Sequence, residues 1–173
     1  MSGGPEVRVL ERFGDAEIAA LSDVLIDCVE GGAGVSFMLP LSAEKAQAYW
    51  RRMALSVARR ERIILVAQDE SGIVGTVQLV LDMPENQPHR AEVAKMLVHR
   101  RARRRGIGAA LLAAVERRAI ESGRTLLVLD TVTGSEGYRL YSRHGWQRCG
   151  EIPDYALSPH GDLCPTTVFF RQL

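Results

Sequence analysis

One stretch near the middle of the chain limits the possible folds more than any other. The run AEVAKMLV (residues 91–98) predicts a β-strand, and a helix is predicted from about Gly106 to Ser122. The apolar residues of that helix repeat at helical spacing: Ile107, Leu111, Leu112, Val115 and Ala119. Five arginines lie between strand and helix, within residues 100–105. The chain therefore has to pass from a strand to a helix through a short, basic, glycine-containing loop.

Two functions are open to this loop. Gly106 and Gly108 let the backbone approach a ligand closely, and the first amides of a helix have no acceptor within the helix, so a phosphate can bind there. The flanking arginines can add charge-assisted hydrogen bonds to the same anion. Alternatively, the arginines form a solvated basic loop or a patch for nucleic acid. With 22 Lys and Arg against 21 Asp and Glu, and a net charge of +1, the basic cluster is local, which argues against a nucleic-acid partner.

The rest of the chain predicts a mixed α/β fold. Alternating or apolar runs predict strands at residues 7–12, 63–68, 73–83, 91–98, 125–132, 146–156 and 164–171. Helices are predicted at residues 15–30, 42–59, 106–122 and 135–144, the second with Ser42 as its N-cap. The strand at 125–132 is nearly all apolar, which is typical of a strand covered on both faces. We expect a single domain over residues 1–173, with a mostly antiparallel sheet of six to seven strands flanked by about four helices.

Several classes of protein are excluded by composition and spacing. The N-terminal stretch MSGGPEVRVLERFGD has no basic-then-apolar signal peptide, and no apolar run approaches the roughly 18 residues of a membrane span, so we expect a cytoplasmic protein without a membrane partner. Three cysteines without CxxC spacing argue against a disulfide framework and are expected to be core thiols. The four histidines lack metal-ligand spacing, and we expect no metal site.

Three phosphate-binding motifs can be compared with the loop. The dinucleotide motif GxGxxG fails because Leu111 occupies its third glycine position, and the motif GxxxxGK[ST] does not occur. The pattern that remains is Arg103-x-x-Gly106-x-Gly108, which fits [QR]xxGx[GA]. With this pattern between its fourth strand and third helix, the sequence resembles the GCN5-related N-acetyltransferases (GNAT family).

Further segments extend the resemblance over nearly the whole chain. LYSRHGW (residues 140–146) is similar to the LYxxxGF segment of the family, and the order of strands and helices agrees from Val7 to Leu173. The runs GVSFMLPL, LDTVTGSEGYRLYSRHGW and IPDYALSPHGDLCPTTVFF resemble the tabtoxin-resistance branch of bacterial acetyltransferases. The resemblance implies transfer of an acetyl group from acetyl-CoA to an amine, by direct attack within a ternary complex.

The resemblance also implies where acetyl-CoA binds. The pyrophosphate would be held by backbone amides and two arginine side chains. These cofactor-binding residues are Arg103, Arg104, Arg105, Gly106, Ile107, Gly108 and Ala109. A backbone N–H of Met96, Leu97 or Val98 would donate to the thioester carbonyl, where negative charge develops. Ser135 stands where many relatives have an asparagine that contacts the pantetheine arm.

Proton transfer requires an acid and a base. Tyr141 occupies the general-acid position of the family, and its ordinary pKa of about 10 leaves the hydroxyl able to donate a proton to the departing thiolate. Glu92 on the fourth predicted strand and Asp130 at the end of the fifth are both candidates for the base that deprotonates the acceptor amine. Either carboxylate could instead bind the substrate ammonium.

The acceptor site is expected at the loop of residues 31–41 and the helix after it, with Phe37, Met38 and Trp50 as candidate wall residues. This apolar loop would cover the site, which favours a small amine or an amino-acid-like acceptor, such as a toxin or an antibiotic, over a protein tail. Two other functions stay open, namely a CoA-binding sensor without catalysis and a nucleic-acid-binding module that uses Arg100–Arg105. The protein is expected to be a monomer or a homodimer.

Overall fold

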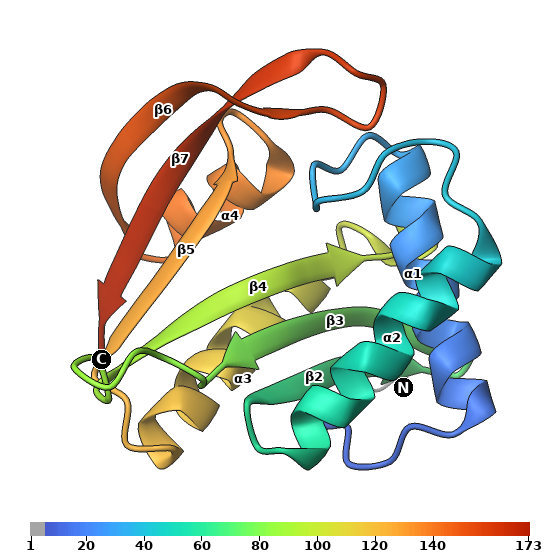
Figure 1. The fold of residues 1–173 in the computed structure, drawn as a ribbon, viewed down its shortest axis with the longest axis horizontal. Coiled ribbons are helices and arrows are strands. Elements are labelled where there is room, and N and C mark those ends of the chain that lie inside the picture. The colour runs from blue at the N-terminus through green and yellow to red at the C-terminus, as the bar shows by residue number, and fades with distance from the viewer. Residues whose placement is uncertain (1–5) are drawn as a thin grey trace.

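The computed structural model describes residues 6–173 and contains one seven-stranded sheet with four α-helices (Figure 1). The first five residues, which begin the N-terminal stretch considered above, lie outside the described residues. The strands are β1 (Glu6–Val9), β2 (Arg62–Asp69), β3 (Gly72–Val80), β4 (Arg90–Val98), β5 (Leu126–Val132), β6 (Gln147–Leu157) and β7 (Leu163–Gln172). The helices are α1 (Asp15–Glu30), α2 (Ala43–Ala58), α3 (Ile107–Glu121) and α4 (Glu136–Arg143), with a short 3₁₀ turn, η1 (Arg100–Ala102).

The sheet is mixed and mostly antiparallel, as predicted. Its strand order is β1-β2-β3-β4-β5-β7-β6, and the pair of β4 and β5 is parallel while the other pairs are antiparallel. Local signals set the helix ends where the sequence placed them: α2 begins after Ser42, whose hydroxyl accepts a hydrogen bond from the Lys45 N–H at 3.1 Å. Among the described residues, no helix combines the length and the apolar character needed to cross a bilayer.

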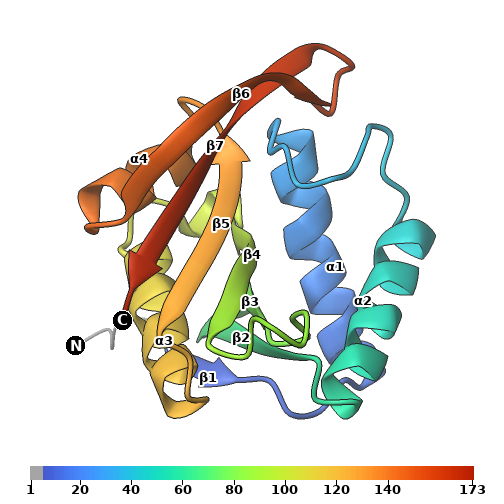
Figure 2. The same ribbon diagram turned by 60° about the vertical axis from the view of Figure 1, so that its left-hand side comes forward.

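Two helical layers cover opposite faces of the sheet (Figures 1 and 2). One core joins α1 and α2 to one side of β2–β4, with Leu25, Trp50 and Ile64 fully buried. The other core joins α3 and α4 to the opposite side, with Leu111, Leu127 and Phe169 at its centre. Successive strand residues point to alternate faces, so β2, β3 and β4 contribute to both cores.

The central strands β4 and β5 stay together for only part of their length. Residues 90–92 of β4 pair with residues 126–128 of β5, and the two strands separate beyond that point. In addition, β4 contains a β-bulge, in which Lys95 and Met96 lie opposite the single residue Val77 of β3. The separation opens the sheet in the middle of the molecule, between the two helical layers.

Two expectations about burial are wrong in detail. The strand β5 is not covered on both faces throughout, because Leu127 and Leu129 are buried but Asp130 is exposed where β5 leaves β4. The cysteines are not all core thiols: Cys28 is buried, Cys164 is partly buried, and Cys149 is exposed. Cys149 lies on β6, an edge strand that is exposed along almost its whole length.

Candidate active site

A cleft of about 910 Å³ lies where β4 and β5 separate. It brings together most of the residues that the sequence identified for cofactor binding and catalysis. The predicted residues that line it are Met96, Leu97, Val98, Arg103, Arg104, Gly106, Ile107, Gly108, Ala109, Asp130, Ser135 and Tyr141. Five predicted residues do not line this cleft: Phe37, Met38, Trp50, Glu92 and Arg105.

One end of the cleft is built from the backbone at the start of α3. Gly106 is the N-cap and has φ +76°, a left-handed backbone conformation that residues with a Cβ rarely adopt. The first hydrogen bond of the helix runs from the Ala110 N–H to the Gly106 carbonyl at 3.0 Å, so the amides of residues 107–109 have no acceptor within the helix. These free amides and the positive end of the helix dipole make this end of the cleft suitable for an anion.

Most side chains of the arginine run are held by carboxylates. Arg100 Nε lies 2.9 Å from Asp27, Arg101 lies 3.3 Å from Asp23, and Arg105 lies 2.9 Å from Asp69. The first two arginines therefore fasten the loop to α1, and Arg105 fastens it to the end of β2. The prediction that Arg105 helps to hold the pyrophosphate is not supported, because its guanidinium is engaged by Asp69 outside the cleft.

Asp27 is the main anchor for this loop. It accepts hydrogen bonds from the Arg100 backbone N–H at 2.7 Å and from Arg100 Nε at 2.9 Å. Burial by itself raises the pKa of Asp27, but the two hydrogen bonds from Arg100 and the charges of His99 and Arg100 outweigh burial, so its pKa is lowered. Arg100 thus holds the Asp27 carboxylate in its charged form, and Asp27 in turn fixes the loop in place.

Two arginines of the run do face the cleft. Arg103 Nε donates to the Val98 carbonyl at 3.2 Å, and its Nη1 lies 3.3 Å from Glu136 at the first turn of α4. Arg104 has φ +61° and, among residues 6–173, is the one arginine of the run that makes no ion pair. The run therefore presents to the cleft one free guanidinium, that of Arg104, and one that a Glu136 carboxylate holds from the other side.

Tyr141 lies in the wall formed by α4. It is 5% exposed and packs against Trp146 and Phe169, with ring centroids at 5.7 and 6.0 Å. Burial, together with the charge of Asp130, raises the pKa of Tyr141, so the hydroxyl stays protonated well above neutral pH. Ser135 forms the N-cap of α4: its hydroxyl accepts from the Tyr138 N–H at 3.1 Å and lies 3.2 Å from the Thr131 hydroxyl.

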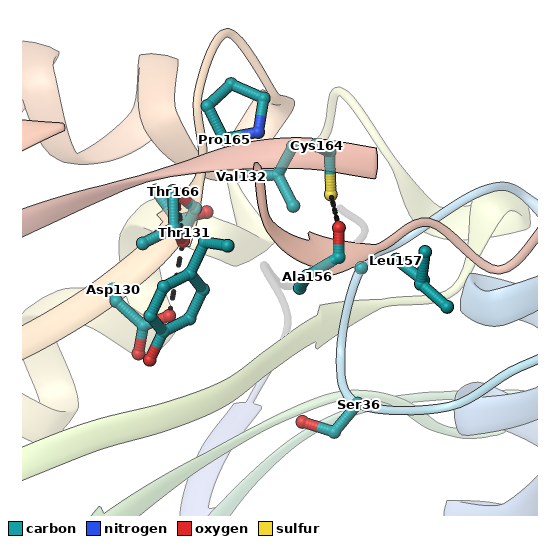
Figure 3. Close-up of a pocket in the computed structure, with 11 residues that line it drawn as sticks. Ser36, Asp130, Thr131, Val132, Ala156, Leu157, Cys164, Pro165 and Thr166 are labelled. Carbon is teal, nitrogen blue, oxygen red and sulfur yellow. Dashed lines mark hydrogen bonds between the residues drawn. The ribbon is translucent and has the colours of Figure 1, made fainter. Parts of the chain in front are cut away.

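The two candidate bases are in different surroundings. Asp130 lines the large cleft and also a second, smaller cavity, and it accepts a hydrogen bond from the Thr166 hydroxyl at 3.3 Å (Figure 3). Glu92 lies on the paired part of β4, where Arg90 Nη1 holds its carboxylate at 2.7 Å, and it lines neither cavity. Only Asp130 therefore has direct access to a bound molecule in these cavities.

The smaller cavity, of about 110 Å³, adjoins the large cleft at the end of β5 (Figure 3). The loop between α1 and α2 and the β6–β7 hairpin form its walls, and the Leu39 N–H donates to the Pro159 carbonyl at 3.0 Å between them. A Cβ on Gly34 would lie 2.6 Å from a Val132 methyl, so only glycine lets the loop come this close to β5.

The expected wall residues of the acceptor site lie elsewhere. Trp50 is fully buried in the core under α2, Phe37 packs edge-to-face on Tyr49 at 5.2 Å, and Met38 is 39% exposed. None of the three lines either cavity. The sequence could not indicate which side chains of this loop face a cavity, because an apolar loop gives no period that separates inward from outward positions.

Lys95 is a charged residue of the cleft that the sequence motifs did not indicate. It lies in the bulge of β4 with φ +52°, and its Nζ donates to the hydroxyl of Ser36, another residue with positive φ (+73°), at 3.2 Å. Such conformations cost about 1–3 kcal/mol each outside glycine and persist at sites that the surroundings enforce. Burial lowers the pKa of Lys95, while the charge of Asp130 opposes this effect.

Comparisons with known proteins agree with this architecture. Residues 60–148 match the family model described as acetyltransferase (GNAT) domain. An "uncharacterized N-acetyltransferase in hisH-hisA intergenic region" of Azospirillum brasilense is 30% identical over 126 residues, which cover 72% of this chain and 73% of that protein.

Solved structures with the same fold share little sequence with the chain. The ribosomal-protein-alanine N-acetyltransferase from Brucella melitensis superposes with a TM-score of 0.80 at 22% identity, over 97% of this chain and 99% of that one. A phosphinothricin acetyltransferase from Sinorhizobium meliloti, in complex with acetyl-CoA, superposes with a TM-score of 0.82 at 18% identity, over 99% and 89% of the two chains. These likenesses confirm the predicted fold.

Proposed function

The chain belongs to the acetyltransferase (GNAT) family, and on this premise we propose that it transfers the acetyl group of acetyl-CoA to a small, amino-acid-like amine. The observation that carries the proposal is the cleft between β4 and β5. It places the free amides of α3 at one end, and Tyr141 and Asp130 also line it. A site for an anionic cofactor and two groups able to move protons thus open into one cavity.

The residues of the cleft fit acetyl-CoA. The amides of Ile107, Gly108 and Ala109 would hold the pyrophosphate, with Arg104 free to add a charge-assisted contact. The absence of a Cβ on Gly106 permits the φ of +76° that starts the helix at this point. Acetyl-CoA supplies the activated acetyl group as a thioester. A backbone N–H of the strand end at Met96–Val98 would donate to the carbonyl oxygen.

Asp130 is the carboxylate we assign to the acceptor amine. It would accept the proton that the ammonium must lose before attack, or orient the amine through a water molecule. Its position at the junction of the two cavities supports this role, whereas Glu92 is occupied by Arg90. Tyr141 would donate a proton to the departing thiolate, because burial keeps its hydroxyl protonated.

The small cavity supports a small acceptor. Its walls are the α1–α2 loop and the β6–β7 hairpin, which are joined by a hydrogen bond and restrict the space beside Asp130. The runs that resemble the tabtoxin-resistance branch support an amino-acid-like toxin or antibiotic as the acceptor. The three free cysteines fit a reducing compartment, which supports a cytoplasmic location.

Two measurements test the proposal. Acetyl-CoA should raise the melting temperature, because it binds only the folded protein. A panel of amines and amino acids, scored by free CoA thiol, should reveal an acceptor. With that acceptor, Asp130→Asn should lower turnover about 100-fold or more, while Glu92→Gln should retain most of it. Binding of acetyl-CoA without thiol release from any acceptor would instead support a non-catalytic CoA sensor.

A further inference from the structure

Lys95 is a cation of the cleft to which the proposed chemistry assigns no role. Twenty of the 22 lysine and arginine residues of the chain are arginine, and the two lysines are Lys45 and Lys95. Lys45 is exposed in the first turn of α2. Lys95 lines the large cleft in the middle of the molecule. Because nearly all other basic residues of the chain are arginine, we infer that the lysine in the cleft has a role that an arginine would not fill.

The backbone directs Lys95 towards the acceptor side of the cleft. The bulge places Lys95 and Met96 opposite Val77, and a bulge re-aims the side chains of its strand. As a result, the Lys95 ammonium lies 3.2 Å from the Ser36 hydroxyl, and Ser36 lines the small cavity. Asp130 lines both cavities. The ammonium and the carboxylate therefore both border the space proposed for the acceptor.

The charge of Lys95 is not matched by a close carboxylate. Within residues 6–173, its ammonium makes one hydrogen bond, to the neutral Ser36 hydroxyl, and takes part in no ion pair. An ammonium has three donors, so a partly buried one keeps capacity for an anion. Four arginines of the loop differ in this respect, because each has a carboxylate partner within 4.0 Å.

We propose that Lys95 binds an acidic group of the acceptor while Asp130 faces its amino group, so that the enzyme selects amines that also carry a carboxylate or a similar oxyanion. This inference rests on the acetyl transfer proposed above and defines the class of its acceptor. A lysine suits the position because its ammonium is compact and has three rotatable donors, whereas a guanidinium is a wide planar fork. Lys95 is thus a residue that determines specificity.

The first test compares matched acceptors and matched variants. The common L-amino acids are offered as free acids, as carboxamides and as decarboxylated amines, together with aminoalkylphosphonates to distinguish carboxylate from other oxyanions. For free acids, Lys95→Met should raise KM about tenfold or more and change kcat little, because it removes a charge-assisted hydrogen bond. The amides and amines should react equally with both proteins. Lys45→Met, the matched control, should behave as the unchanged protein.

The second test measures binding of an anion at Lys95 without any catalytic turnover. In the absence of acetyl-CoA, the protein is labelled with the N-hydroxysuccinimide ester of acetic acid, and labelling at the two lysines is compared by mass spectrometry. The whole panel of the first test is used, whether or not its members react: at least one free acid should protect Lys95 and leave Lys45 unchanged, and its amide should protect neither lysine.

The outcomes separate the two proposals. If free acids protect Lys95 but no amine releases CoA thiol, the proposal of acetyl transfer is wrong and the proposal of an anion site at Lys95 stands. If acids and amides react equally well and Lys95→Met affects both equally, the anion site is wrong and the acetyl transfer stands. Failure of every free acid to protect Lys95 would also overturn the anion site.

Discussion

The two halves of the cleft are built in different ways. The half that faces α3 consists of backbone amides, a glycine N-cap and two arginines, all within residues 103–109. The half that faces the small cavity consists of side chains from four separate segments: the α1–α2 loop, the bulge of β4, the end of β5 and the β6–β7 hairpin. In the proposed function, the first half would bind the pyrophosphate of acetyl-CoA, and the second would bind the acceptor.

Because the two halves are built differently, we expect a substitution in one half to leave ligand binding in the other half unchanged. A backbone site at a helix start depends on local conformation, which few substitutions other than those at its glycines disturb. A site formed by side chains on loops can change its ligand while the fold is retained. Substitutions in the cofactor half should therefore weaken acetyl-CoA binding, and those in the acceptor half should change which amine reacts.

The largest effect is expected at Tyr141, which lines the large cleft from α4. Tyr141→Phe removes the proton donor but keeps the ring that packs on Trp146 and Phe169, so kcat should fall about 100-fold or more while acetyl-CoA affinity is retained. The matched control is Tyr138→Phe, one helical turn earlier, whose ring also packs on Phe169. Full kcat in Tyr141→Phe, measured by CoA thiol release, would remove Tyr141 from the mechanism.

The next largest effect should be confined to the cofactor half. Gly106→Val forces a β-branched residue into φ +76° at the start of α3, and it should weaken acetyl-CoA binding about tenfold or more in calorimetric titrations. Gly123→Val is the control, because Gly123 has φ +72° just after the other end of the same helix, with equal open space. Equal loss of affinity in both variants would show that strain in α3 acts on the site indirectly.

A smaller effect, on stability alone, is expected at Asp27. Asp27→Asn weakens the hydrogen bonds to Arg100 and should lower the free energy of unfolding at pH 7 by about 1–3 kcal/mol, measured in urea. The pKa of Asp27 is lower in the folded state, so the folded protein prefers the charged form, and this contribution is present above the unfolded pKa of about 3.9. It should be lost as the pH falls from this value through the lower pKa of the folded state. A difference in stability between the two proteins that does not shrink as the pH falls would rule out the charge as its cause.

The smallest effect is expected at Arg105. Its guanidinium is half exposed beside Asp69, and the hydrogen bonds from Ser71, followed by that of Arg105, lower the pKa of Asp69 to about 2. Exposed ion pairs contribute about 0–1 kcal/mol, so Arg105→Gln should change stability little and leave acetyl-CoA affinity unaltered. A large loss of affinity would show that Arg105 leaves Asp69 to contact the cofactor.

The sequence predicted what is encoded locally. Ser42 as a helix cap, Gly106 at the start of α3 and the order of strands and helices along the chain are set by short patterns and by the alternation of apolar residues, and the structure contains all of them. The mixed sheet and the flanking helices agree with the solved relatives. Most of the residues predicted for cofactor binding line the cleft for the same reason.

The acceptor half could not be predicted in the same way. Lys95 sits in a strand pattern that gives no sign of a bulge, and the bulge decides where its ammonium lies. Glu92 and Asp130 are both strand carboxylates, and only the point at which β4 leaves β5 determines which of them reaches the cleft. Trp50 fits an acceptor wall or a core equally well until packing places it under α2.

Hydrogen–deuterium exchange measured with and without acetyl-CoA tests the division of the cleft most directly. We predict that acetyl-CoA alone slows exchange in residues 103–109 and at the start of α4, while the α1–α2 loop and the β6–β7 hairpin respond only after an acceptor is added. Protection by acetyl-CoA confined to the α1–α2 loop and the hairpin, with none in residues 103–109, would contradict the account.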